Sequence, residues 1–141
     1  MDTAVRTETH DGAADRDRLV AGIVDVLCIV GIVLLGRISH SGNPIAEPIA
    51  SLETVTPFVV GWLAVAALAG VYATDRAGAS REFRLPAVTW IAAANVGLML
   101  RGSPLFDGGT TWPFPVVITA TGLAVLLGWR LVYTLYLSAT R

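Results

Sequence analysis

The sequence contains no lysine, a single cysteine and few charged residues, and the last two shortages each exclude a class of protein. Charged residues are 15% of the 141 residues and hydrophobic residues 54%, a balance that a soluble domain of this size would not keep in solution. The net charge is −1 and no basic cluster is interleaved with aromatics, so we expect no nucleic-acid partner. Cys28 has no second cysteine for an intramolecular disulfide, and its apolar neighbours favour a role in core packing.

Signatures of catalysis are also missing from the sequence. It has no HExxH motif, no paired cysteines, no glycine-rich phosphate loop and no nucleophile elbow, and His10 lies in a polar N-terminal tail. We therefore expect a protein that is not an enzyme and that holds no metal ion or other cofactor.

Long apolar segments are what the chain does contain, near residues 19–37, 55–73, 85–101 and 114–137. Residues 19–36 of the first segment are an 18-residue run with one charge, which is about 27 Å of helix against a hydrocarbon core of roughly 30 Å. Pro57 falls in the first turn of the second, where proline is tolerated. The third is the shortest and the weakest of the four. The pattern predicts an all-α membrane protein, an antiparallel four-helix transmembrane bundle in the lipid bilayer.

Residues 1–18 form a separate region before this 19–141 transmembrane domain. They contain five acids and three arginines and almost no large apolar side chain. Such a segment buries too little surface to offset its ordering entropy. We expect a disordered acidic tail.

The arginines beside the spans predict the orientation, because cytoplasmic flanks carry the excess of positive residues. The tail and the middle loop hold Arg16, Arg18, Arg76, Arg81 and Arg84. The other two loops, 38–54 and 102–113, are each preceded by a single arginine, Arg37 and Arg101. We expect a multi-pass protein of the cell membrane with cytoplasmic N- and C-termini. The aromatics fit belts at the inner interface (Trp90, Trp129, Tyr133 and Tyr136) and the outer one (Trp112).

The two halves of the chain look alike. GIVLLGRISHSGNP and VGLMLRGSP end the first and third spans, and TPFVVGW and WPFPVV open the second and fourth. A duplication would give two similar helical hairpins related by an axis along the membrane normal. Chance similarity between apolar helices is the alternative.

Asp25 and Arg130 are ionisable residues inside spans, where a charge costs about 2.5–3.5 kcal/mol at the helix centre and is kept with a partner or a wet cavity. Helical rise places both about 9–11 Å from the cytoplasmic ends of their spans, so they can meet. Gly22, Gly36 and His40 share the helical stripe of Asp25. A structural ion pair is the favoured interpretation. A proton or cation pathway through Asp25, or an Arg130 that reaches the headgroups without meeting Asp25, are the alternatives.

An outer-face polar cluster is predicted from Arg37, His40 and Arg101 on or beside the two outer loops. The arginines anchor helix ends in headgroups in the plainer interpretation. In the sharper one the cluster binds an anion or a lipid headgroup, with His40 adding a charge that changes near pH ~6.5.

Asn95 is an intramembrane polar residue, for which a hydrogen bond between helices is the expected role. The small residues Ala120, Ala124 and Gly128 form a four-residue stripe on the fourth span, and Ala93 with Gly97 a shorter one on the third. We expect both to be packing faces within the bundle. A homo-oligomer interface is the alternative.

Several polar positions recur among the apolar ones: Asp25, Gly36-Arg37-Ile38-Ser39-His40, Pro57-Phe58 with Gly61-Trp62, Gly97 through Arg101, and Gly128-Trp129-Arg130. In these the chain resembles the uncharacterised prokaryotic membrane-protein family called domain of unknown function 3054, over roughly Leu19 to Tyr133. The resemblance implies the architecture and no activity. We therefore expect a structural or interaction protein, with an ion or small-solute pathway as the alternative and outer-face anion binding as a third hypothesis.

Overall fold

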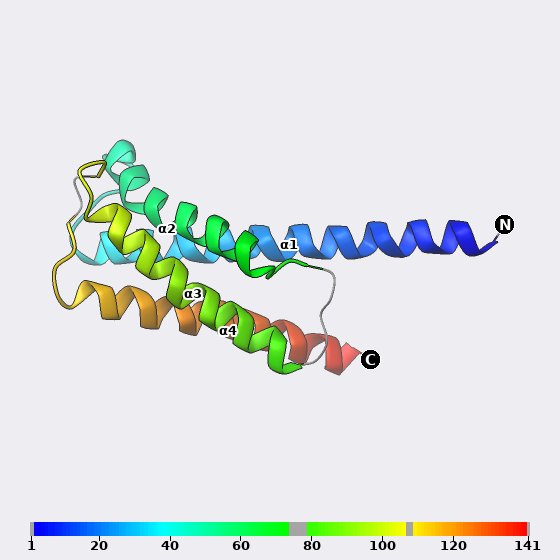
Figure 1. Cartoon of the computed structure of the whole chain (residues 1–141). Coiled ribbons are helices and arrows are strands. Elements are labelled where there is room, and N and C mark those ends of the chain that lie inside the picture. The colour runs from blue at the N-terminus through cyan, green and yellow to red at the C-terminus, as the bar shows by residue number, and fades with distance from the viewer. Residues whose placement is uncertain (1, 74–78, 107–108, 141) are drawn as a thin grey trace.

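The computed structural model describes residues 2–73, 79–106 and 109–140 and folds them into four helices (Figure 1). They are α1 (Asp2–Ser39), α2 (Pro48–Ala69), α3 (Ala79–Arg101) and α4 (Phe114–Thr140). Arg76, Asp107 and Arg141 lie outside the described residues. The expected all-α fold with four long apolar helices is confirmed.

The helices run alternately up and down and pack as a ring. Each contacts its neighbours in the chain, and α1 and α4 close the ring. Both termini and the α2–α3 connection lie at one end, here called the terminal end, and the α1–α2 and α3–α4 connections lie at the other, the loop end (Figure 1). Each helix is therefore antiparallel to the next.

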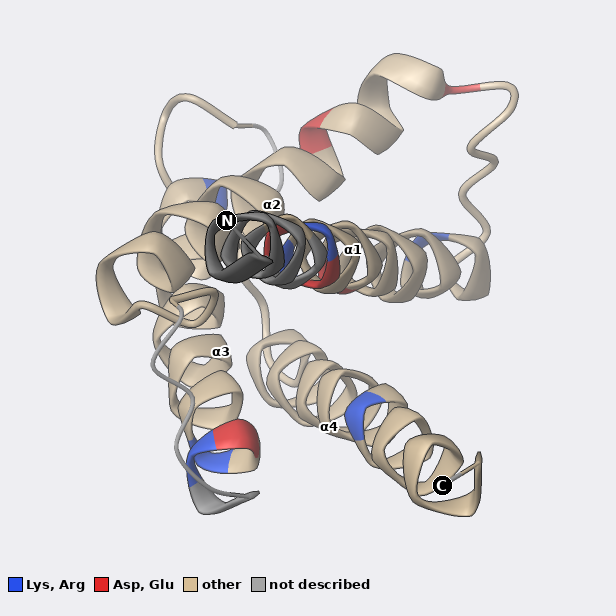
Figure 2. Cartoon of the chain, turned by 90° about the vertical axis from the view of Figure 1, so that its right-hand side faces the viewer, with Lys and Arg blue, Asp and Glu red and all other residues tan. Residues whose placement is uncertain are grey.

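All four helices contain a segment long and apolar enough to cross a membrane: Asp15–Ser39, Pro48–Ala69, Arg81–Arg101 and Phe114–Thr140. The third is the least apolar of them. Large apolar side chains cover the outside of the bundle, with Leu68 89% exposed and Leu27 63% exposed. Figure 2 shows that charged residues are sparse along the sides of the helices. This is a surface built for lipid.

The acidic tail differs from our expectation, because α1 continues through it as one helix from Asp2. The tail extends beyond the other helices (Figure 1). Helix propagation is cheap once a nucleus exists, and the apolar part of α1 supplies that nucleus. Asp15 and Arg18, with Oδ1 and Nη2 3.2 Å apart, add an i, i+3 ion pair.

The start of α2 also differs from the prediction, since the helix begins at Pro48 rather than near residue 55. Proline at the first helical position needs no N–H partner. The hydroxyls of Ser51, Thr54 and Thr56 donate to carbonyls four residues earlier in the chain, so this polar stretch leaves no hydroxyl donor without an acceptor. Pro57 consequently lies inside α2, where proline removes one backbone hydrogen bond.

Close helix contacts occur where glycine replaces a side chain. A Cβ at Gly61 would lie 2.6 Å from the Ala93 carbonyl oxygen, and one at Gly97 would lie 2.7 Å from the Phe58 ring. The short stripe of Ala93 and Gly97 is thus a packing face between α3 and α2. The stripe of α4 is not a packing face within the bundle, because Ala120 and Ala124 are exposed and α4 instead buries the roughly opposite face, which contains Gly122.

Candidate functional site

Asp25 lies on the face of α1 that points into the bundle. The residues one and two turns further along, Ile29 and Val33, are 0% and 4% exposed, and Asp25 itself is 0% exposed. Of the three residues predicted to share the inward face with Asp25, Gly22 does so and faces the Tyr72 ring. Gly36 and His40 are exposed instead. The carboxylate is therefore removed from solvent and from lipid, and it needs donors from the protein.

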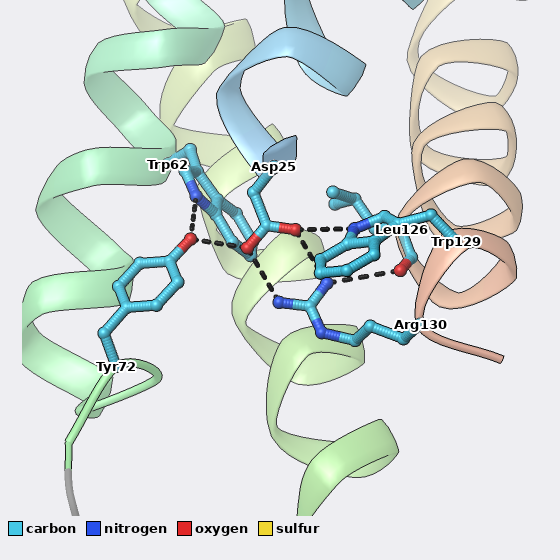
Figure 3. A network of polar contacts seen from close by, with 6 residues as sticks. All are labelled: Asp25, Trp62, Tyr72, Leu126, Trp129 and Arg130. Carbon is cyan, nitrogen blue, oxygen red and sulfur yellow. Dashed lines mark hydrogen bonds and ion pairs between the residues drawn. The ribbon is translucent and has the colours of Figure 1, made fainter. Parts of the chain in front are cut away.

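Arg130, on the buried face of α4, supplies two of those donors. Its Nη1 donates to Asp25 Oδ1 at 2.8 Å and its Nη2 donates to Oδ2 at 2.7 Å, a bidentate pair (Figure 3). Nη1 also reaches the Leu126 carbonyl oxygen at 3.2 Å. With Arg130 7% exposed, both charges of the pair are buried.

Tyr72 and Trp129 complete the shell of Asp25, and our sequence reasoning missed both. The Tyr72 hydroxyl donates to Oδ2 at 2.5 Å and the Trp129 indole N–H donates to Oδ1 at 2.8 Å (Figure 3). The Trp129 ring also stacks on the guanidinium, with Arg130 Cζ 4.9 Å from the ring centroid. Each carboxylate oxygen thus accepts two hydrogen bonds.

The backbone turn at the end of α2 is what brings Tyr72 to the site. Gly70 adopts the left-handed conformation, with φ 69° and ψ 35°. Its N–H donates to Ala67, at 3.3 Å, and the Val71 N–H donates to Ala66, at 3.1 Å, the pattern of a Schellman motif. The chain therefore reverses at once and returns the ring of Tyr72 towards α1.

The contacts continue from Tyr72 around the whole bundle. Trp62 on α2 donates its indole N–H to the Tyr72 hydroxyl at 3.0 Å. The Trp62 ring packs against that of Trp90 on α3, at 6.3 Å between centroids, and the Trp90 N–H donates to the Thr119 carbonyl of α4 at 3.0 Å. Beginning from Asp25, this series of contacts involves all four helices. Trp90 and Trp129 are consequently internal donors and not members of an interfacial belt.

A small cavity adjoins Arg130 on its terminal side. It measures about 20 Å³, which is enough for one water molecule. Its lining includes Arg81, Glu82 and Pro86 from the start of α3 and Val71 from the end of α2. The ion pair is thus packed against protein on most sides, and a small space lined in part by Arg81 and Glu82 lies beside its cationic partner.

The loop-end residues do not converge on one another as a single cluster. Arg37 Nη2 pairs with Glu47 Oε2 at 2.6 Å, and Arg101 Nε donates to the Gly109 carbonyl at 2.9 Å. The Arg101 guanidinium also covers the Phe114 ring, at 4.8 Å from its centroid, and the positive charges of Arg37 and Arg101 act on each other. His40 is exposed at the end of α1. Each arginine therefore holds its own helix end to the connection that follows.

Asn95 is exposed on α3, contrary to the expected hydrogen bond between helices. Its side-chain Nδ2 donates back to the Ile91 carbonyl of its own helix at 2.8 Å. The face of α3 that packs inward holds Trp90 and Ala93, and Asn95 lies about 140° around the helix from Trp90.

The chain is thus a multi-pass membrane protein of the helical-bundle class, with four candidate membrane helices connected through a buried ion pair. Among the described residues, no group of three or more His, Cys, Asp and Glu side chains is arranged to hold a metal ion. The model of the family described as Protein of unknown function (DUF3054) matches residues 22–133, so the chain belongs to that family and the resemblance is confirmed. Comparison with the curated proteins and with the solved structures gave no match.

Proposed function

We propose that this protein is a structural or interaction protein of the cell membrane and is neither an enzyme nor a conduit. The observation that carries the proposal is the saturated environment of Asp25. Two N–H groups of Arg130, the Trp129 indole and the Tyr72 hydroxyl occupy its two oxygens, and its side chain is 0% exposed. A carboxylate that exchanges protons or cations needs an open coordination position, and here every position is occupied by a fixed donor.

The proposal places both termini in the cytoplasm. Arg16, Arg18, Arg81 and Arg84 belong to helix segments at the terminal end, and cytoplasmic flanks carry the excess of positive residues. The lipid bilayer is the environment of the exposed apolar surface. The protein partners that we propose for this chain are other membrane helices, including further copies of the chain, and we propose no nucleic-acid partner.

Reconstitution into liposomes that contain a pH-sensitive dye tests the proposal. We expect the full chain to pass protons and monovalent cations no faster than protein-free vesicles. Flux in the wild type that disappears in Asp25→Asn, with the variant still folded by circular dichroism, would overturn it. Val55→Ala, on the loop-end half of α2, is the matched control, because it perturbs the buried core and leaves the ion pair intact.

A proton pathway through Asp25 is the second candidate, and the cavity beside Arg130 favours it. A water there would lie next to Arg130, Arg81 and Glu82, on the terminal side of the pair. Arg130 would then compete with a proton for the carboxylate. This candidate requires Glu82→Gln to slow proton flux in the liposome assay. The structural proposal requires the wild type and Glu82→Gln to show the same flux as protein-free vesicles.

Outer-face anion binding at Arg37, His40 and Arg101 is a third candidate, favoured by the repulsion between the charges of Arg37 and Arg101, which a bound anion would relieve. Glu47 already neutralises Arg37 in part, which supports anchoring of the loop end instead. Analysis of the lipid that copurifies with the protein separates the two roles.

A further inference from the structure

Asn95 is a polar side chain on an apolar outer surface. Its neighbours on that face of α3 are Val88 and Met99, which are 64% and 76% exposed. It lies six residues before Arg101 and fourteen after Arg81, so helical rise places it about 9 Å and about 21 Å from the two charged ends of the span. An amide at this depth has no water to pair with.

The hydrogen-bonding capacity of Asn95 is unmet within one copy of the chain. A side-chain amide offers two N–H donors and one carbonyl oxygen. One N–H donates to the Ile91 carbonyl, and within the described residues the oxygen accepts no hydrogen bond. Thr121, exposed on α4, is the contrast, because its hydroxyl donates to the Val117 carbonyl at 2.6 Å and so needs no external partner.

We propose that the outer face of α3 is a self-association surface in which Asn95 of one copy hydrogen-bonds Asn95 of a second copy. All copies insert in the same orientation, so a two-fold axis along the membrane normal brings the same residue of both copies to the same depth. An amide carries a donor and an acceptor, so two of them pair reciprocally. Ala92, one turn before Asn95, is small and lets the two α3 helices approach closely.

The identity of the occupant follows from this complementarity. A different partner would have to present a donor at the depth of Asn95, whereas a second copy does so by symmetry. The exposed small residues Ala120 and Ala124 on α4 lack such a polar group, and Thr121 beside them is satisfied internally. The α3 face is therefore the one assigned to the dimer. The inference rests on the proposed membrane insertion and is independent of the role of the Asp25–Arg130 pair.

Energy transfer between dye-labelled copies of the full chain in liposomes, over a series of lipid dilutions, tests the proposal. We expect reversible association of the wild type and a rise of roughly three- to ten-fold in the dissociation constant for Asn95→Leu. Thr121→Val is the matched control, because it also removes an exposed polar group and should leave the dissociation constant unchanged. Thermal unfolding of both variants should match the wild type, which separates loss of association from loss of fold.

Disulfide trapping gives a second readout with Asn95 retained. In a Cys28→Ala background, Met99→Cys should form a covalent dimer on oxidation, since Met99 lies one turn from Asn95 on the same face. Leu131→Cys, on the outer face of α4, should not. A wild type that shows no energy transfer above random proximity, or an Asn95→Leu variant that associates as well as the wild type, overturns the proposal. A flux measured in the liposome assay above would overturn the proposed function and leave this inference standing.

Discussion

Asp25→Asn should destabilise the bundle far more than its small change in size suggests. The variant removes the negative charge and leaves the guanidinium of Arg130 without a counter-charge, although Arg130 is only 7% exposed. Breaking a buried pair from one side costs about 3–5 kcal/mol. We expect the lower part of that range, about 3 kcal/mol, because Nη1 keeps the Leu126 carbonyl at 3.2 Å and the cavity beside Arg130 offers room for a water.

The double variant Asp25→Asn with Arg130→Met removes both charges at once. The new amide retains an oxygen that can accept the Trp129 N–H, so one indole donor stays satisfied. We expect the double variant to be about 2 kcal/mol less stable than the wild type, because neither charge is left uncompensated. This loss is well short of the summed losses of the single variants Asp25→Asn and Arg130→Met. The coupling free energy between the two sites should therefore exceed about 2 kcal/mol.

Equilibrium unfolding in mixed micelles, followed by tryptophan fluorescence, measures the cycle. Val55→Ala is the additivity control, because it lies fifteen residues before the Gly70 turn, which is about 22 Å of helix from the site. Its effect should add to that of either single variant. Single variants within about 1 kcal/mol of the wild type, with an additive double variant, would refute the reasoning that the pair holds the helices together.

Three further results are expected. Tyr72→Phe should cost about 1–3 kcal/mol in unfolding free energy, because Asp25 loses a donor and the Trp62 N–H loses its acceptor. Gly122→Ala should lower the melting temperature by circular dichroism strongly, since its Cβ would lie 2.1 Å from the Trp90 ring, whereas Gly128→Ala, with nothing within 4 Å, should not lower it. Arg37→Gln should leave the anionic lipid that copurifies with the protein unchanged, and a selective loss of that lipid would instead support headgroup binding.

The sequence was informative about Asp25 and Arg130 because a charge within an apolar span is expensive wherever it lies, and the depth of each is read from helical rise. It was less informative about Tyr72 and Trp129. Aromatic residues near span ends are typical of the interfacial belt, and both positions satisfy that description. A search for neutral donors at the depth of Asp25 would have found Trp129, beside Arg130, but not Tyr72, whose position depends on the turn at Gly70.

Helix number and the least apolar span followed from composition, whereas boundaries and faces did not. The polar stretch before Pro57 looks like a loop because its hydroxyls are satisfied only after the helix has formed. The predicted hydrogen bond from Asn95 to another helix of the bundle was wrong, because Asn95 shares its face of α3 with apolar residues, which suit lipid and core equally. In a bilayer, apolar periodicity does not distinguish the inside of a bundle from the outside.

The distance along the chain between Asp25 and its partners has a consequence for biosynthesis. Tyr72 follows Asp25 by 47 residues and Arg130 follows it by 105. When α1 enters the membrane during translation, the Asp25 carboxylate therefore has none of these donors. The favourable insertion of the apolar residues of α1 has to offset the cost of inserting this carboxylate. The ring of helices closes when α4, the last to be synthesised, delivers Arg130 and Trp129 together. Chains that stop after α3 should thus insert but stay open, and would be expected to reach membrane quality control before they reach a stable fold.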